Sequence, residues 1–405
     1  MPVAARPLSP PCPAHSLDDT VAGASRQINA LTGIRALAAL WVVGFHFALF
    51  PLGAFGLNAV FPPLSYGYLG VDLFFLLSGF IIYHVHQRDT RSLSVRGVLH
   101  FYGLRLARMY PVHLLTLCGL AVVLLVSRRV GIMPTHPEDF RAVDFVYNLL
   151  LIHSWGVADD IHWNSPAWSI SCEWLVYLLF PLLALGLNRL VSMRRAALWL
   201  GAEVALFALA YVFFFHYNLD NKFDGHFARY ALARVCIEFT LGALCCRLRG
   251  LVDMRAWPWT AMVLAAILVA ILLDATPLRD LAIVAVFVLM ILASSLPGNL
   301  VARVLALPVL VYLGEISYSL YMIHAPMRMT LGKLLESRLP QASRLAASLM
   351  AVGFLLATII AAAATYHIIE APARRWLRRF LDRLGDARIG RSPRQIPQYN
   401  ARSMG

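Results

Sequence analysis

Ten stretches of mostly apolar residues, each roughly 20 residues long, constrain the fold of this chain more than any other feature of its sequence. A helix of about 20 residues crosses the ~30 Å hydrocarbon core of a bilayer. Hydrophobic residues make up 60% of the chain and charged residues only 14%, well below the charged fraction of a typical soluble protein. The sequence therefore predicts an all-α, polytopic membrane helix bundle, with about ten transmembrane helices near residues 30–51, 67–86, 110–127, 167–187, 196–216, 230–247, 257–274, 280–297, 308–327 and 345–369.

The distribution of basic residues predicts the orientation of these helices. With a cytoplasmic N-terminus, the inner loops and tails hold 23 Lys and Arg residues and the outer loops hold 10, so the positive-inside rule favours N-in and C-in. We expect a disordered cytoplasmic tail over 1–29, one transmembrane domain over 30–372 and a basic cytoplasmic tail over 373–405. The net charge of +13 lies mostly at the ends of apolar stretches and in this tail, which indicates contact with anionic membrane lipid rather than nucleic acid.

The first apolar stretch, GIRALAALWVVGFHF, carries Arg35 and His46 eleven positions apart. At ~100° per residue, eleven steps return to within about 20° of the same helix face, and at ~1.5 Å per residue the two Cα atoms lie roughly 16 Å apart. The spacing predicts a cation near the cytoplasmic end of one helix stripe and a titratable ring nearer its outer end.

Three more titratable side chains are expected at the depth of His46 in the outer half of the bilayer. Counted from the outer ends of their stretches, Asp72 and Glu173 lie about five or six residues in, and His324 lies three or four. Ionisable groups that face lipid are costly, so these four are predicted to face a cavity or one another. A second layer of charged side chains is expected at the inner side of the membrane, formed by Arg35, Arg105, Arg108 and Glu370. Its arginines suit phosphate oxygens, which accept paired hydrogen bonds from a guanidinium.

Six motifs, in order over residues 31–374, resemble those of the acyltransferase-3 family of integral-membrane acyltransferases: LTGIRALAALWVVGFH (31–46), GVDLFFLLSGFII (70–82), RLARMYPVHLL (105–115), WSISCEWLVYLLFP (168–181), LGEISYSLYMIHAP (313–326) and YHIIEAPAR (366–374). The first carries the family's arginine and histidine, separated by ten residues. The family's serine and glutamate are present as Ser169 and Glu173, although the residues between them include Ile-Ser-Cys. The resemblance implies a cytoplasmic donor such as acetyl-CoA and an acceptor hydroxyl at the outer side.

We expect His46 to act as the general base, because imidazole gains and loses a proton near neutral pH. Glu173 or Asp72 would orient the ring, as a carboxylate does in a hydrolase triad. Arg35 would hold the phosphate or pantetheine part of the donor. Binding of the two substrates is expected to involve five side chains, Arg35, Arg105, Arg108, His324 and Trp168. No metal site is expected.

Each candidate also has a structural interpretation. His46 could be a hydrogen-bonding group between helices, the two carboxylates could join helices, and the arginines could only anchor the topology. Trp168 could be an anchor at the membrane interface. In the LLSGF motif, Ser78 and Gly79 are predicted to form a close helix contact, with a nucleophilic role for Ser78 as the alternative.

The predicted function is transfer of an acyl group, expected to be acetyl, from acyl-CoA to a hydroxyl of a cell-surface polysaccharide such as O-antigen or exopolysaccharide, or to its lipid-linked precursor. Alternatives are an acyltransferase that acts on a small lipophilic product such as a macrolide, and a carrier that moves a lipid-linked or acylated glycan without chemistry. Arginine-rich, lysine-poor usage suggests a high-GC bacterium, and we expect the inner membrane. Acyl-CoA is the expected donor substrate, with no permanently bound cofactor.

Overall fold

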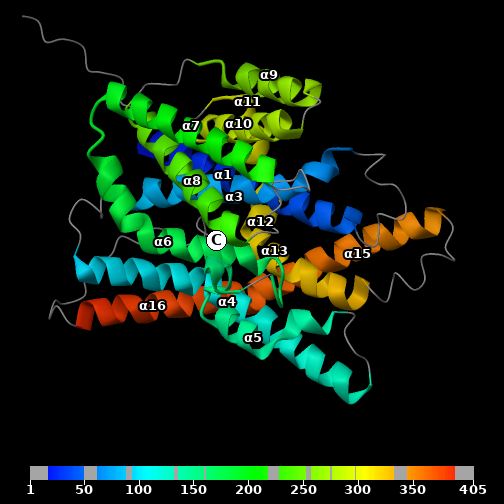
Figure 1. Ribbon diagram of the computed structural model, residues 1–405. Coiled ribbons are helices and arrows are strands. Elements are labelled where there is room, and N and C mark those ends of the chain that lie inside the picture. The colour runs from blue at the N-terminus through cyan, green and yellow to red at the C-terminus, as the bar shows by residue number, and fades with distance from the viewer. Residues whose placement is uncertain are drawn as a thin grey trace, which may run out of the picture.

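The computed structural model describes residues 17–49, 62–87, 94–131, 136–158, 161–217, 228–251, 257–273, 276–296, 298–332 and 344–387. Within these ranges the chain is helical and contains no strand (Figure 1). The predicted all-helical architecture is therefore confirmed for the part of the chain that the structure describes.

A helix overlaps each of the ten predicted stretches. These helices are α1 (Leu17–Leu49), α3 (Gly70–His86), α4 (Val95–Arg129), α6 (Ala167–Asn188), α7 (Met193–Tyr217), α8 (Ala228–Arg249), α9 (Trp259–Leu272), α10 (Thr276–Ser294), α12 (Pro308–Glu315) followed by α13 (Ser317–Met327), and α15 (Arg344–Thr365). Shorter helices are α5 (Ala142–Leu149) and α11 (Leu300–Leu305), and α16 (Ala371–Ala387) follows α15 through a π-helical turn.

Five helical segments among the described residues are long and apolar enough to cross a membrane: Asn29–Phe47, Pro62–His86, Val95–Arg129, Ala167–Asn188 and Leu349–Leu384. Two of the other predicted stretches form helices that are shorter than expected. The helix α9 has only 14 residues, and the stretch 308–327 is divided by a turn at Ile316. By length and composition, the structure thus supports a membrane protein with at least these five segments.

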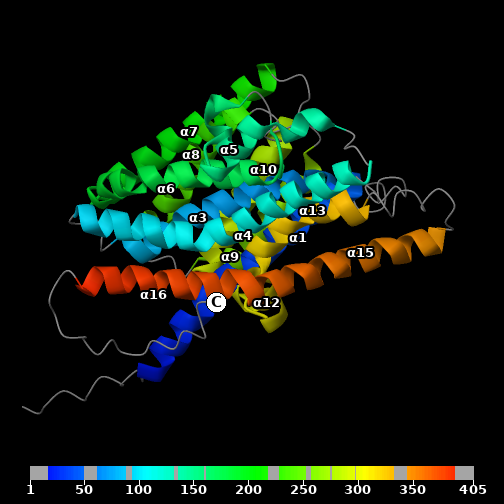
Figure 2. The same ribbon diagram turned by 90° about the horizontal axis from the view of Figure 1, so that it is seen from below.

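Both ends of the bundle carry more helix than the apolar pattern predicts. The helix α1 begins at Leu17, so residues 17–29, expected as part of a disordered tail, form a helical extension (Figure 2). Residues 1–16 lie outside the described part.

The expected C-terminal tail is helical up to Ala387 and packs against α4. His100 Nε2 lies 3.0 Å from Asp382 Oδ1, and a Cβ added to Gly103 would lie 2.9 Å from Leu381. Figure 2 shows α15 and α16 as nearly one line along the bundle, with α16 beside α4. The basic tail is therefore a continuation of the last long helix over these residues.

Glycines let the central helices approach until their backbones touch. A Cβ on Gly79 in α3 would lie 1.9 Å from the Phe239 oxygen in α8, and one on Gly242 in α8 would lie 1.9 Å from the Leu76 oxygen. Small residues at such positions are typical of helix contacts in membranes. The predicted close packing at the LLSGF motif is confirmed for Gly79.

Replacing Gly79 or Gly242 by alanine is expected to lower the melting temperature of the purified protein in detergent. The added Cβ would overlap a backbone oxygen, so α3 and α8 must separate, which costs about 1–3 kcal/mol. The matched control is Gly119→Ala in α4, where nothing lies within 4 Å of an added Cβ. An equal loss of stability in the control, or none at Gly79, would contradict this packing.

Candidate active site

The register between α1 and α3 sets the depth of the candidate side chains. A Cβ on Gly67 would lie 2.3 Å from the Trp41 oxygen, and one on Gly70 would lie 2.7 Å from the Ala38 oxygen. The two segments therefore run antiparallel, and Asp72 lies beyond Gly70, toward the end of α1 that carries Arg35.

The prediction that Asp72 lies at the depth of His46 is wrong. From the register above, the two are ten residues apart in depth, roughly 15 Å along the α1 axis. The physical reason is the 3₁₀ segment Pro62–Leu69, which precedes α3 and forms the outer part of the candidate span Pro62–His86. Asp72 is thus about ten residues from the outer end of this span, twice the distance expected.

His46 and His324 do come together, from α1 and α13, with ring centroids 4.9 Å apart. His46 Nδ1 lies 2.9 Å from the Val42 oxygen, and His324 Nδ1 lies 2.5 Å from the Tyr321 oxygen. A carbonyl only accepts, so in each neutral ring Nδ1 carries the hydrogen and Nε2 the lone pair. His46 is half-buried and His324 is fully buried. We call this pair the histidine end.

Asp72 instead forms an ion pair with Arg234 of α8. Arg234 Nε donates to Asp72 Oδ1 at 2.8 Å and Nη2 donates to Oδ2, while Nε also lies 3.4 Å from Glu238 Oε1. Asp72 and Glu238 are fully buried, and Arg234 nearly so. This arrangement favours the structural interpretation of Asp72, which joins α3 to α8. Sequence reasoning did not select Arg234, although an arginine inside an apolar stretch was its signal.

Glu173 also lies away from the histidine end. Its Oε1 accepts from Ser78 Oγ at 2.9 Å and from the Tyr177 hydroxyl. Ser78 follows Asp72 by six residues, roughly 9 Å further along α3 in the direction away from His46. The Arg105 guanidinium lies 6.0 Å from the Tyr177 ring centroid. The predicted common layer of four titratable groups is therefore wrong for Glu173 as well, and Ser78 and Tyr177 are its unpredicted partners.

Arginines gather at the opposite end of the Arg35–His46 stripe, as expected. The charges of Arg108, Glu370, Arg374 and Glu173 act on Arg35, which is half-buried. Among the described residues, Arg35 forms no hydrogen bond or close ion pair. We call the four cations Arg35, Arg105, Arg108 and Arg374 the arginine end.

Two further features complete this end. Glu370 is fully buried; its Oε2 accepts from Ser319 Oγ at 2.6 Å, and its Oε1 has no partner within the described protein. Arg374 comes from α16, which sequence reasoning assigned to a lipid-contacting tail. The arginine end therefore joins α1, α4 and α16 around guanidinium groups with unused donors, which suits a polyanionic ligand.

Trp168 is not at a surface where it could stack on an acceptor. Its side chain is 8% exposed, and its ring packs edge-on against Phe75 at 6.1 Å between centroids. The structure thus favours a packing role for Trp168.

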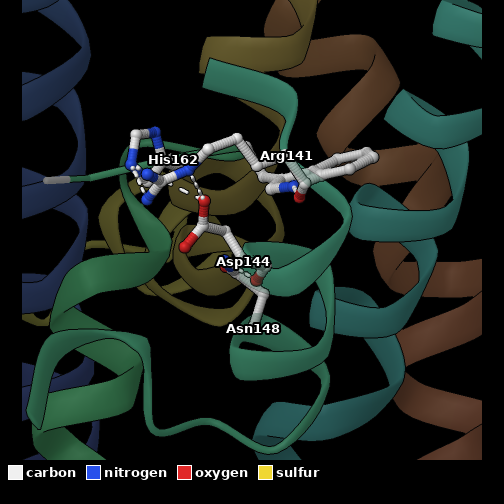
Figure 3. A network of polar contacts seen from close by, with 5 residues as sticks. Arg141, Asp144, Asn148 and His162 are labelled. Atoms are coloured by element: carbon white, nitrogen blue, oxygen red, sulfur yellow. Dashed lines mark hydrogen bonds and ion pairs between the residues drawn. The ribbon is translucent and has the colours of Figure 1, made fainter. Parts of the chain in front are cut away.

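The segment between α4 and α6 contains α5 and an ordered polar network (Figure 3). Arg141 Nε donates to Asp144 Oδ2 at 2.5 Å, and Arg141 Nη2 lies 2.9 Å from His162 Nε2. Asn148 Nδ2 donates to the Asp144 oxygen at 2.9 Å. Beyond this network, Asn164 Nδ2 donates to the Met322 oxygen in α13 at 3.1 Å. On the other side, His113 Nε2 of α4 lies 2.9 Å from the Asn148 oxygen. These contacts hold the segment against α4 and against α13, two residues before His324 in the chain.

The two ends suit different chemistry. Guanidinium groups bind phosphate oxygens through paired, charge-assisted hydrogen bonds, whereas an imidazole with a lone pair at Nε2 accepts a proton. Along α1 the two are separated by roughly 16 Å.

Comparison with known proteins gives related chains over most of this length. Acyltransferase MdmB of Streptomyces mycarofaciens is 28% identical over 383 residues, which cover 87% of this chain and 93% of that protein. A putative O-acetyltransferase of Staphylococcus aureus strain COL is 24% identical over 400 residues, 92% of this chain. The chain spans 60% of the length of that relative.

A third relative, O-acetyltransferase OatA of Staphylococcus aureus strain NCTC 8325, is 28% identical over 165 residues, 39% of this chain and 24% of its own length. No solved structure matches the chain. The family model described as an acyltransferase domain matches residues 28–367. The chain therefore belongs to the acyltransferase-3 family, a family of O-acyltransferases.

Proposed function

We propose that this protein transfers an acyl group, with acetyl as the expected group, from acyl-CoA at the arginine end to an acceptor hydroxyl at the histidine end. The observation that carries the proposal is the separation of the two ends along one face of α1. We further propose about ten transmembrane helices with both termini cytoplasmic, and a location in a bacterial inner membrane. The arginine end then faces the cytoplasm, where acyl-CoA is made.

The arginine end fits the donor because acyl-CoA carries several phosphates. Arg35 is half-buried and has unused donors, while Arg108 and Arg374 lie close enough for their charges to act on it. A phosphate there would relieve the repulsion among these cations. The flexible arm that links the phosphates to the thioester would then extend toward His46, over roughly 16 Å.

The histidine end fits the acceptor because a hydroxyl must lose its proton as it attacks the thioester. His46 Nε2 would take this proton, the new C–O bond would form as the C–S bond breaks, and the thiolate would be protonated to leave as free CoA. The Val42 carbonyl holds the ring through Nδ1, so in the neutral ring Nε2 carries the lone pair that would take the proton.

For the acceptor we propose a hydroxyl of a cell-surface polysaccharide or its lipid-linked precursor. The relatives named O-acetyltransferases in Staphylococcus aureus support transfer to oxygen. The second candidate acceptor is a small lipophilic product such as a macrolide.

Membranes that contain the protein are expected to move labelled acetyl from acetyl-CoA into surface glycan, and His46→Ala is expected to reduce the rate by about 10²–10⁴, the usual contribution of a general base. The measurement is label in the extracted glycan at equal protein amounts. The matched control is His136→Ala, since His136 is exposed and pairs only locally with Glu138 at 3.0 Å.

Equal labelling by a well-expressed His46→Ala variant would remove His46 from this role. If wild-type membranes label no glycan but label a lipophilic product, the second acceptor is correct. No label in either fraction would favour the carrier without chemistry.

Arg35→Ala and Arg108→Ala are each expected to raise the KM for acetyl-CoA about tenfold or more, because hydrogen bonds to charged groups contribute about 1.5–3 kcal/mol. The maximal rate should change less, since these residues lie far from His46. Arg303→Ala, at an exposed position of α11, is the control. An unchanged KM in both variants, with normal protein levels, would make these arginines topology anchors only.

A further inference from the structure

The contact between α3 and α8 buries two carboxyl groups around one cation. Asp72 and Glu238 are each 0% exposed and Arg234 is 4% exposed. We propose that Asp72 and Glu238 share a single proton beside Arg234, so that Glu238 is a neutral carboxylic acid and the bundle contains a proton-binding site on α3 and α8.

Arg234 forms its ion pair mainly with Asp72 rather than with Glu238. Both oxygens of Asp72 accept from Arg234, one at 2.8 Å, in the paired arrangement that binds a carboxylate most strongly. Glu238 shares only the Nε hydrogen, with a distance of 3.4 Å to its Oε1. Glu238 Oε2 is buried and has no hydrogen-bond partner within the described protein. The positive charge of Arg234 therefore balances the negative charge of Asp72, and an ionised Glu238 would have no cation of its own.

An ionised Glu238 would leave an excess negative charge in an apolar interior. The effective cost of burying an unpaired ion is several kcal/mol, and repulsion from Asp72 adds to it. The charged groups that act most on Glu238 are Asp72 and Arg234. From the neighbouring helices, Arg234 also acts on Cys172 of α6 and Tyr321 of α13, and neither thiol nor phenol supplies a second cation.

A proton on Glu238 resolves both problems. It removes the excess charge, and it allows the two carboxyl groups to lie close together: Asp72 Oδ1 and Glu238 Oε1 both lie at Arg234 Nε, at 2.8 and 3.4 Å. Oxygens of two ionised carboxylates around one N–H would repel each other, whereas an acid O–H on Glu238 can donate to Asp72. The proton thus stabilises α3 against α8 at the turn next to the backbone contact of Gly79 with Phe239.

The site is distinct from both ends of the candidate active site. It uses α8, which supplies none of the residues at the arginine or histidine ends. Its protonation is a property of the folded protein and does not depend on which reaction the protein catalyses.

Infrared spectroscopy of the purified protein tests this proposal. A protonated carboxyl has a carbonyl stretch above the amide band that shifts in D₂O, whereas a carboxylate absorbs below it. The spectrum of wild type minus Glu238→Gln is expected to contain this acid band. Glutamine is a neutral analogue of the protonated side chain, so the variant should fold and keep a similar melting temperature. The matched control, Glu138→Gln at an exposed site, should show only loss of carboxylate absorption.

A second variant, Asp72→Asn, removes the competing carboxylate and leaves Glu238 itself unchanged. In Asp72→Asn, Arg234 has one carboxyl to pair with, so Glu238 is expected to ionise and the acid band to disappear. If wild type minus Glu238→Gln shows only carboxylate bands, or if the acid band persists unchanged in Asp72→Asn, the shared proton is wrong. Loss of acyl transfer in these variants would not bear on this conclusion, because the spectra report protonation directly.

Discussion

A charge in an apolar helix bundle is stable only where another group compensates it, and this constraint arranges the interior of the protein. Several polar groups in the interior join helices that are distant in sequence. Asp72 and Arg234 connect α3 to α8, Ser78 and Glu173 connect α3 to α6, and Ser319 connects α13 to Glu370 at the end of the last long helix. The polar residues therefore hold the bundle together as well as forming its candidate site.

The same constraint separates two kinds of arginine. Arg234 is buried and its donors are engaged by carboxylates, so it has little capacity left for a ligand. Arg35 is half-buried and forms no hydrogen bond with another described residue, while cations from α4 and α16 lie near it. Only the second arrangement gains from an incoming anion. Both residues are arginines inside apolar stretches, so the sequence alone does not tell them apart. What distinguishes them is whether a carboxylate in the folded protein pairs with the guanidinium.

The sequence contains enough information for the helices and for the Arg35–His46 stripe, because both depend on periodicity along one segment. The depths of Asp72 and Glu173 in the membrane depend on how α3 and α6 are placed relative to the other helices, which periodicity along one helix does not reveal. The 3₁₀ segment before α3 moved Asp72 away from His46, and no apolar pattern reveals such a segment. Arg374 was missed for a related reason, because basic residues beyond the last apolar stretch resemble a solvated tail until α16 is seen to pack on α4.

With Asp72 and Glu173 placed elsewhere, the proposed function calls for a histidine end that differs from a hydrolase triad. Backbone carbonyls accept from the Nδ1 atoms of His46 and His324 and so orient both rings. Two rings with centroids 4.9 Å apart repel each other when both are cationic, and the pair therefore favours at most one extra proton. One proton is what a single acceptor hydroxyl releases. Under the proposed function, the buried imidazole of His324 next to His46 would share that proton, where a triad uses a carboxylate to stabilise it.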